Sequence, residues 1–440
     1  MRVLLIQAVS SINGGEAVFP LGLARLAAEV EDIHEVKGID LNLVPFPWTP
    51  LKETLKDYTP DVVGVSFRNL DPLAGNLVSF VPQLKALATF VRTNAPEAKL
   101  VIGGSGFSLF AQRLMREIPE FDYGLVGEGD QTFRLLLDHL DAPATVPGVI
   151  TANQDVSTVA FGRETDLDRM PLPCYHLFPP ENYLKLNRYV AFMGIETKRG
   201  CPYHCSYCLY PLLQGGTVRL RDPRLVVNEI EYLIKHHGVG SFHFTDAVLN
   251  FPPSHLESIC QEILRRGLKV QWTGFFREDH LTARGLDLYA KAGLSTIYFS
   301  GDGASESALK LLNKGFDLAR IKKAAKISAA SGLITVYHFL VNLPEESRET
   351  AEESRNIVDF LLDIHKQSRN PAAFVFNNLR LYPGAPLTRR IMEQGLIDPQ
   401  TDLLYPVYFN PPPYDGLRHD LTARVINPAD FAADCGRKGV

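Results

Sequence analysis

The stretch that decides the fold is Lys198-Arg199-Gly200-Cys201-Pro202-Tyr203-His204-Cys205-Ser206-Tyr207-Cys208. It follows an apolar segment at residues 190–196 that is typical of a buried strand. The spacing C-x3-C-x2-C brings three thiols into one short loop, and thiolates are the usual ligands of iron–sulfur clusters. A [4Fe–4S] cube held by these three would keep one iron open to an outside ligand. The alternative is a structural zinc loop, but its nearest further ligand, His204, lies between two of the cysteines.

The composition sets the class of protein around this loop. The chain has 440 residues, enough for two or three domains at roughly 150 residues each. Hydrophobic residues make up 45% and charged residues 22%, as in ordinary globular proteins. The net charge of −5 gives no broad basic surface, so we expect no nucleic-acid partner. No apolar run approaches the roughly 20 residues that span a bilayer, and the first apolar stretch is too short for a signal peptide. We therefore expect a cytoplasmic protein.

Downstream of the loop, strand and helix patterns alternate. Six strands separated by helices predict an incomplete βα barrel, a partial (β/α)6 barrel. The predicted strands are residues 190–196, 241–245, 269–275, 296–300, 335–341 and 374–379, and the clearest helices are residues 225–237, 254–266 and 318–331.

Upstream, a second strand–helix series predicts an open, doubly wound, Rossmann-like parallel sheet, again of the α/β class. Such sheets bind ligands at the carboxyl ends of their strands. The predicted strands are residues 3–7, 37–41, 61–67, 99–102 and 123–126, and the predicted helices are residues 20–29, 77–93 and 130–139.

Two proline clusters and the loss of periodicity separate the two series. We therefore expect a Rossmann-like domain at residues 1–140, a packed linker at 141–188, the barrel at 189–395 and a C-terminal extension at 396–440.

The cysteine loop after a strand resembles that of the radical S-adenosylmethionine (SAM) superfamily, over about residues 190–395. The resemblance implies that a [4Fe–4S] cluster is held by Cys201, Cys205 and Cys208, and that SAM chelates the open iron through its amino and carboxylate groups. It implies further that the reduced cluster cleaves SAM to a 5′-deoxyadenosyl radical. An external electron donor of the flavodoxin or ferredoxin type would reduce the cluster.

Other segments resemble the same family in the same order. Ser300-Gly301-Asp302-Gly303 ends the fourth strand, where the family binds the ribose and methionine parts of SAM. Residues 342–346 follow the fifth strand but lack the glycines of the family's Gly-x-Pro-Gly-Glu, and residues 380–384 resemble its Arg-x-Tyr-Pro-Gly. Each segment taken alone is equally explained as a turn or cap. The residues that the resemblance assigns to SAM are Tyr207, Asp246, Arg277, Ser300, Asp302 and Arg380.

The upstream sheet resembles the cobalamin-binding (B12-binding) domain that precedes some radical SAM barrels, over about residues 1–140. Gly103-Gly104 matches the place where the nucleotide tail of the corrinoid runs close to the backbone, and Gly127-Glu128-Gly129-Asp130 resembles Gly-Glu-Gly-Glu. Alternatively, both glycine pairs are simple turns. The loop at residues 8–15 lacks the histidine that coordinates cobalt in many relatives. The resemblance then implies either a corrinoid bound without a protein ligand or a domain that has lost it.

The corrinoid face implied by this resemblance comprises Ser66, Arg68, Gly103, Gly104 and Gly127. A cation at Arg68, close to the lower face of cobalt, would disfavour a lower ligand and leave a methyl group labile. Alternatively, Arg68 pairs with Asp71 or with a side-chain amide of the corrinoid.

Weaker candidates remain outside these motifs. We expect Cys260 to be a core residue, and Tyr210, Tyr337 and His338 to serve packing. Cys174 and Cys435 could reach a site. Arg219 and Arg221 could neutralise a substrate acid or the SAM carboxylate, or could lie solvated at a helix start.

The resemblance implies a cobalamin-dependent radical SAM enzyme. The main hypothesis is a methyltransferase that acts on an unactivated carbon, or a phosphinate phosphorus, of a small molecule or peptide. One alternative is a non-methylating enzyme of this architecture that forms or rearranges rings or transfers another SAM fragment. Another is a corrinoid- or cluster-binding sensor without turnover. No motif identifies the substrate or a catalytic residue.

Overall fold

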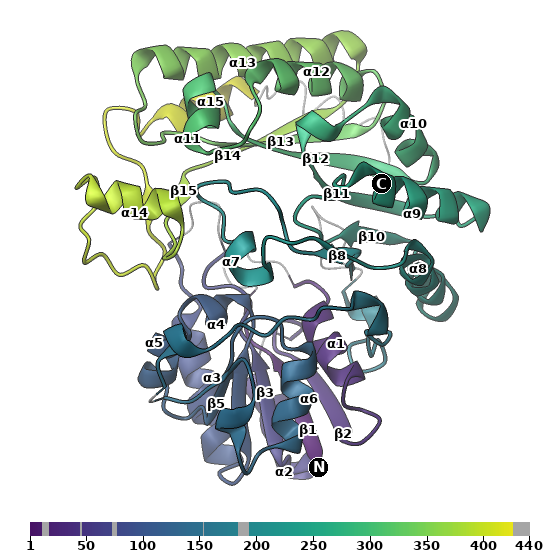
Figure 1. Cartoon of the computed structure of the whole chain (residues 1–440), viewed down its shortest axis with the longest axis vertical. Coiled ribbons are helices and arrows are strands. Elements are labelled where there is room, and N and C mark those ends of the chain that lie inside the picture. Colours follow the sequence, from purple (N-terminus) through teal and green to yellow (C-terminus); the bar gives the residue numbers. More distant parts are fainter. Residues whose placement is uncertain (11–16, 45, 73–76, 153, 184–192, 426–440) are drawn as a thin grey trace. The chain divides into compact units, whose positions relative to one another are not determined.

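A computed structural model describes residues 1–10, 17–44, 46–72, 77–152, 154–183 and 193–425. They form two compact units (Figure 1). The first comprises Met1–Pro202, Leu209–His243 and Asp402–Pro406, and the second comprises Tyr203–Cys208, Phe244–Thr401 and the chain from Val407 onward. The boundary between them divides the cysteine loop, so the first cysteine belongs to one unit and the other two to the other.

The first unit contains the predicted doubly wound sheet. Its six strands lie in the order β2-β1-β3-β4-β5-β6, and all pairs are parallel except β5 with β6. The crossing from β1 to β2 on one side and to β3 on the other makes the carboxyl ends of these strands a switch point. The strands are β1 Arg2–Gln7, β2 Glu35–Asp40, β3 Val62–Ser66, β4 Lys99–Gly103, β5 Tyr123–Leu125 and β6 Val149–Ile150.

Helices connect these strands, and three of them were not predicted. Helix α2 buries Leu51, Leu55 and Tyr58, a helical spacing within a sequence that is otherwise polar. The predicted helix at residues 77–93 begins only at Val81. The helices are α1 Leu21–Ala28, α2 Trp48–Tyr58, α3 Val81–Asn94, α4 Ser105–Leu109, α5 Ala111–Glu117 and α6 Asp130–Asp138; α2, α4 and α5 are the additions.

The segment after α6 packs on this sheet although it forms only short turns and β6. Tyr183 donates a hydrogen bond of 2.8 Å to the carboxylate of Asp40, at the end of β2. The ring of Phe178 lies against Gly38, where a Cβ would be 2.5 Å from the ring. These buried aromatic contacts make the segment part of the first unit.

The rest of the first unit surrounds the first cysteine. The strand predicted at residues 190–196 is β7, Gly194–Ile195, and residues 190–192 lie outside the described residues. The elements that follow are β8 Lys198–Arg199, α7 Tyr210–Gln214, β9 Arg219–Leu220, α8 Pro223–His237 and β10 Ser241–Phe244.

The second unit continues the strand–helix alternation of the predicted barrel. Four parallel strands lie in the order β14-β13-β12-β11. They are β11 Gln271–Phe276, β12 Leu294–Gly303, β13 Ile334–Leu340 and β14 Ala372–Asn377. The helices are α9 Pro253–Arg265, α10 Ala283–Lys291, α11 Glu306–Leu311, α12 Leu318–Ala329 and α13 Arg348–Ser368.

The tail adds elements that its sequence did not suggest. Strand β15, Leu379–Arg380, pairs antiparallel with β16, Tyr408–Phe409, and the helices are α14, Pro386–Glu393, and α15, Leu417–Val425. Among all the helices described, none is long and apolar enough to cross a bilayer.

Candidate functional site

The part of the cysteine loop in the second unit is fixed through its backbone. The Ser206 N–H donates to the Leu312 carbonyl at 2.9 Å, and the Ser206 carbonyl accepts from the Leu387 N–H at 2.8 Å. The side-chain amide of Asn313 donates to the His204 carbonyl at 2.7 Å. The turn after α11 and the start of α14 therefore hold the loop between its second and third cysteines.

The three cysteines are not in disulfides and lie in different surroundings. Cys201 is buried in the first unit, and its N–H donates to the Gly215 carbonyl at 3.1 Å. Cys205 and Cys208 are half-buried in the second unit, in a turn closed by a 3.1 Å bond from the Cys208 N–H to the Cys205 carbonyl. Gly200 has a φ of +89°, and a Cβ there would lie 2.1 Å from the Thr217 carbonyl oxygen. A glycine is therefore required just before the first cysteine.

Arg277, predicted to contact SAM, packs against Tyr203 of the cysteine loop. Its guanidinium lies 3.7 Å from the centre of the Tyr203 ring, in the loop, and forms a 2.9 Å ion pair with Asp279. It also donates to the Lys314 carbonyl at 2.6 Å. Burial disfavours its charge, but Asp279 outweighs burial and raises the Arg277 pKa. The Tyr203 hydroxyl in turn bonds to His280, so the ring is held on two sides.

Asp302 forms the most concentrated polar group of the second unit. Its Oδ2 accepts a hydrogen bond from the Tyr207 hydroxyl and a 2.8 Å bond from the Lys314 ammonium. Burial and the charge of Asp302 raise the Tyr207 pKa far above its ordinary value. Lys314 is buried, which disfavours its charge, but the neighbouring Asp302 carboxylate raises its pKa. Asp302 also adopts a φ of +59°, a conformation that non-glycine residues rarely take outside functional or tightly fixed positions.

The other residues predicted for SAM lie at strand ends of the same unit. Asp246, after β10, and Arg380, in β15, are buried. The Arg380 guanidinium lies 4.6 Å from the centre of the Tyr382 ring, and Ser300 is half-buried in β12. The structure thus brings Tyr207 and Asp302 into contact and links Arg277 to them through Lys314.

Glu278, which the sequence did not single out, is an unusual buried acid. Neither carboxylate oxygen has a hydrogen-bond partner among the described residues, and its exposed fraction is 3%. Burial raises its pKa to about 8; Lys314 opposes the shift and Asp302 adds to it. The group is therefore mostly protonated at neutral pH.

In the first unit, a cavity of about 230 Å³ opens at the carboxyl ends of the strands. Ser66, Gly103, Gly104 and Gly127, four of the five residues predicted to face a corrinoid, line it. Apolar residues from α1 and α6 line one part of it (Leu23, Leu26 and Phe133), and charged residues line another (Glu128, Asp130, Glu196 and Arg199). The apolar part suits a flat, uncharged ring system.

The two glycines of the Gly103-Gly104 pair have different reasons to be glycine. Gly104 has a φ of +104°, and a Cβ there would lie 2.7 Å from the Phe67 carbonyl oxygen. At Gly103 the nearest atom to such a Cβ is a Leu125 carbon at 3.6 Å, an ordinary contact. The approach of its own chain therefore already requires glycine at Gly104, whether or not a ligand lies there, and Gly103 is the position with open space.

Arg68, the fifth predicted residue, is exposed just beyond β3. Together with burial, its charge lowers the pKa of His243, in β10, to about 4. His243 is therefore a neutral imidazole at physiological pH, and its proximity to Arg68 could not be predicted from residues 175 positions apart in the sequence.

The weaker candidates divide clearly. Cys260 is buried in α9, as predicted. The hydroxyl of Tyr337 is 2.8 Å from His365, and His338 is 3.1 Å from the Phe299 carbonyl, which agrees with packing roles. Tyr210, by contrast, is 42% exposed.

The structure contradicts the alternative that Arg219 and Arg221 lie solvated at a helix start. Arg219 bonds to Glu128 at 2.6 Å, and Arg221 is buried against Glu229 at 2.8 Å. Cys435 lies outside the described residues.

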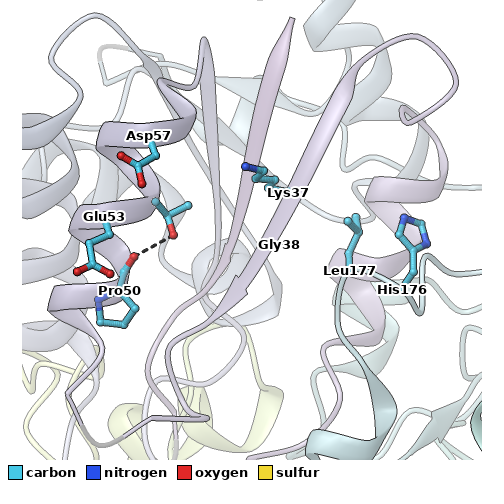
Figure 2. Close-up of a pocket in the computed structure, with 8 residues that line it drawn as sticks. Lys37, Gly38, Pro50, Glu53, Asp57, His176 and Leu177 are labelled. Atoms are coloured by element: carbon cyan, nitrogen blue, oxygen red, sulfur yellow. Dashed lines mark hydrogen bonds between the residues drawn. The ribbon is translucent and has the colours of Figure 1, made fainter.

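A second hollow of the first unit, about 440 Å³ in volume, lies between β2, α2 and the segment after α6 (Figure 2). Lys37, Glu53, Asp57 and His176 are among its lining residues, and no residue predicted for cofactor binding is. Cys174 lies beside His176, which lines this hollow. The thiol of Cys174 lies beside Glu31, and burial together with that carboxylate raises its pKa. The cysteine is thus a buried thiol outside the candidate cofactor site.

Two family models match the chain. A B12 binding domain matches residues 11–137, and the radical SAM superfamily matches residues 195–358. The chain combines a B12 binding domain with a radical SAM domain. The fold class and family expected from the cysteine loop and the glycine turns are confirmed.

Several curated members of this family are similar over most of the chain. An "uncharacterized methyltransferase PH0819" of Pyrococcus horikoshii is 26% identical over 80% of this chain and 76% of its own length. The anaerobic magnesium-protoporphyrin IX monomethyl ester cyclase of Rubrivivax gelatinosus is 28% identical over 80% of this chain and 65% of its length. The cytidylyl-2-hydroxyethylphosphonate methyltransferase of Streptomyces wedmorensis is 25% identical over 89% and 81%.

Solved structures of this radical SAM family share the fold. The methyltransferase TsrM of Kitasatospora setae, solved with cobalamin and a [4Fe–4S] cluster, gives a TM-score of 0.77 at 24% identity, covering 98% of this chain and 91% of its own. The cobalamin-dependent enzyme OxsB gives 0.76 at 16% identity, covering 96% and 66%.

Proposed function

We propose that this protein is a cobalamin-dependent radical SAM methyltransferase that acts on an unactivated carbon, or a phosphinate phosphorus, of a small molecule or peptide. The observation that carries the proposal is the pairing, in one chain, of a three-cysteine loop with a glycine-lined cavity at the carboxyl edge of a parallel sheet. Relatives named as methyltransferases support the reaction type.

The donor set fits the cluster. Cys201, Cys205 and Cys208 would hold a [4Fe–4S] cluster, because three cysteines outside any disulfide lie in one loop whose backbone is fixed by hydrogen bonds. When bound, the cluster and SAM supply one-electron chemistry, and the corrinoid supplies a transferable methyl group. The protein's part is to hold these groups and the substrate in register and to exclude water.

Polar residues of the second unit would bind SAM. Tyr207 and Lys314 hold Oδ2 of Asp302, while Oδ1 accepts no bond from the described residues and is available to a ribose hydroxyl. Arg277 would act through Tyr203 by fixing the loop. Asp246, Ser300 and Arg380 would complete the site from their strand ends.

The first-unit cavity would take the nucleotide tail of a corrinoid. Gly103 leaves space for it, while Ser66, Gly104 and Gly127 form the surrounding wall. Arg68, exposed beyond β3, would face the corrinoid, which we propose is bound without a histidine from the protein. Residues 11–16 of the loop after β1 lie outside the described residues.

The remaining expectations stay part of the proposal. They are the domain limits 1–140, 141–188, 189–395 and 396–440, an external flavodoxin- or ferredoxin-type electron donor, the lack of a nucleic-acid partner and a cytoplasmic location.

A second function is favoured by the relatives named as cyclases, which include the one from Rubrivivax gelatinosus. In that case the chain would rearrange its substrate without methylating it. Methylation by SAM leaves S-adenosylhomocysteine, whereas the alternative reaction does not. Counting the SAM-derived products of turnover therefore distinguishes the two.

The test is anaerobic reconstitution followed by optical spectra, iron analysis and SAM-product analysis. The wild-type chain should take up both a cluster and cobalamin and should form 5′-deoxyadenosine under reduction. Replacing Cys201, Cys205 and Cys208 together by Ala should abolish cluster iron and SAM cleavage. Cys260→Ala is the matched control, because that thiol is buried in α9 and lies outside the loop. Cluster iron and SAM cleavage in the triple variant would refute the assignment, and a wild-type chain without 5′-deoxyadenosine would instead support a sensor.

A further inference from the structure

Six charged side chains form one buried network in the first unit, which we name the charged clamp. It joins three carboxylates and three guanidiniums that come from four separate segments of the chain. Its members are Glu128, Asp130, Arg163, Glu196, Arg199 and Arg219.

Arg199 is the centre of the charged clamp. Its Nη1 and Nη2 donate to the two oxygens of Asp130 at 2.6 and 3.1 Å, and Nη1 also donates to Glu128 at 3.0 Å. Its Nε donates to both oxygens of Glu196 at 3.0 Å. The side chains of Arg199, Glu128 and Asp130 are only 7–8% exposed, so these pairs are barely screened by solvent.

Glu128 carries the second half of the charged clamp. Its Oε1 and Oε2 accept bonds of 2.6 and 2.9 Å from the two terminal nitrogens of Arg219, and Arg163 lies 3.6 Å away. Burial opposes its charge, but Arg219 and Arg199 outweigh burial and keep the Glu128 pKa below its ordinary value. The acid is therefore ionised, as a bidentate pair requires.

The position of these pairs explains why the acids are needed. Strands β8 and β9 pair antiparallel, and Arg199 lies directly opposite Arg219. Two like charges facing each other across strands are destabilising, and two buried ones far more so. Glu128 bonds to both arginines and Asp130 bonds to Arg199, so these two acids together balance the two positive charges of the strand pair.

The strand pair β8 and β9 flanks the segment that contains the first cysteine. Residues 200–218 run from β8 to β9, with Cys201 just two residues beyond Arg199. The Cys201 N–H bonds to the Gly215 carbonyl within this segment. Whatever fixes β8 against β9 therefore fixes the backbone of Cys201.

We propose that Glu128 and Asp130, in the turn between β5 and α6, are positioning residues for the cysteine loop. The Gly127-Glu128-Gly129-Asp130 turn thus does two things. Its residues line the candidate corrinoid cavity, and its two carboxylates bond to the arginines of the strands that flank Cys201. The inference rests on the proposed function, because it assigns these acids a role toward the cluster.

The test measures how fast the reconstituted full-length protein loses iron to a ferrous chelator without SAM. Glu128→Gln keeps the shape of the side chain but removes its charge, and should release iron at least about fivefold faster than wild type. Glu128→Asp, which keeps the charge on a shorter arm, should lie between them. If Glu128→Gln does not fold, Arg219→Lys takes its place in the test. It keeps the charge but loses the bidentate pair, and should release iron faster than wild type by less than about fivefold.

Arg92→Lys is the matched control. Arg92, in α3, also forms an ion pair in the first unit, at 2.8 Å to Asp122, but this pair lies just before the amino end of β5 and contacts neither β8 nor β9. It should release iron at the wild-type rate, and melting curves show whether it and Glu128→Gln are equally folded.

Two results would overturn the inference. One is wild-type iron release in folded Glu128→Gln. The other is an equal acceleration in Arg92→Lys, which would make the effect one of general stability. Binding of hydroxocobalamin is measured in parallel. If the turn contributes only to corrinoid binding, Glu128→Gln would bind hydroxocobalamin more weakly and release iron at the wild-type rate. If the wild-type chain takes up no cluster, the proposed function fails rather than this inference.

Discussion

The two parts of the cysteine loop are held by different physical means. Around Cys201, in the first unit, buried charges fix two short strands. Around Cys205 and Cys208, in the second unit, backbone hydrogen bonds and the Tyr203 ring, stacked on the Arg277 guanidinium, fix the loop. Removing one partner of a buried charge pair leaves the other charge uncompensated and is strongly destabilising, whereas the loss of one of many small contacts costs little stability. Substitutions in the two regions should therefore differ in their effects.

The largest effect is expected at the glycine turn of the first unit. Gly104→Val places a branched side chain at a φ of +104° and 2.7 Å from a carbonyl oxygen. Backbone strain alone costs about 1–3 kcal/mol, so with the clash the variant should lose more than about 3 kcal/mol of unfolding free energy in urea titrations.

Gly103→Leu is the contrasting substitution. Its Cβ meets only an ordinary contact, so the variant should fold, while its side chain fills the cavity and should weaken cobalamin binding at least about tenfold. Equal stability losses in the two variants would contradict the different reasons given for these glycines.

The second effect concerns Asp302 in the second unit. Asp302→Ala removes an acceptor for SAM and leaves the buried ammonium of Lys314 without its 2.8 Å partner. A charged hydrogen bond contributes roughly 1.5–3 kcal/mol, so SAM should bind at least about tenfold more weakly by calorimetry. Tyr207→Phe, which removes only the hydroxyl bond to Asp302, should have a smaller effect. Unchanged SAM affinity in Asp302→Ala would remove this residue from the site.

The contrast between the two regions also explains what the sequence could predict. The β3 strand was evident because a parallel strand covered on both faces is continuously apolar, and the cysteines were evident because ligand spacing is local. Glu128 and Arg199, however, are 71 residues apart, and only the folded sheet makes them neighbours. Lys314 and Glu278 were missed for a related reason: charged residues in turns are ordinarily solvated, and nothing in a sequence marks those that the fold buries.

The third effect is a pH dependence that originates at Glu278, in the second unit. The Glu278 pKa is about 8 in the folded chain against 4.5 ordinarily, so the native state keeps a proton that the unfolded state releases. Its contribution to stability is complete below pH 4.5 and is lost as the pH rises through 8. Between these values the free energy of unfolding should fall by up to about 1.4 kcal/mol per pH unit.

Glu278→Gln cannot release a proton and should flatten that slope. Urea titrations at pH 5.5, 6.5 and 7.5 would measure it. The change of the unfolding free energy with pH is the quantity to compare, because the new amide changes the unfolding free energy itself by the same amount at every pH. An identical slope in wild type and variant would show that Glu278 ionises normally. Glu262→Gln is a control, since that acid has its pKa lowered to about 2 by Arg265 and Arg266 and does not titrate in this range.

The smallest effect tests the stacked side of the loop. The Arg277 guanidinium lies 3.7 Å from the centre of the Tyr203 ring and stays paired with Asp279 whatever happens to the ring. Tyr203→Leu therefore removes a cation–π contact without leaving a charge unpaired, and should cost about 0.5–2 kcal/mol of unfolding free energy. Tyr203→Phe keeps the ring and loses only the bond to His280, so it should cost less. Iron release from the reconstituted variants should follow the same order, with Tyr203→Leu milder than Glu128→Gln, because here no buried charge is left without a partner. A Tyr203→Phe variant that is as unstable as Tyr203→Leu would mean that the hydroxyl, and not the ring, fixes this half of the loop.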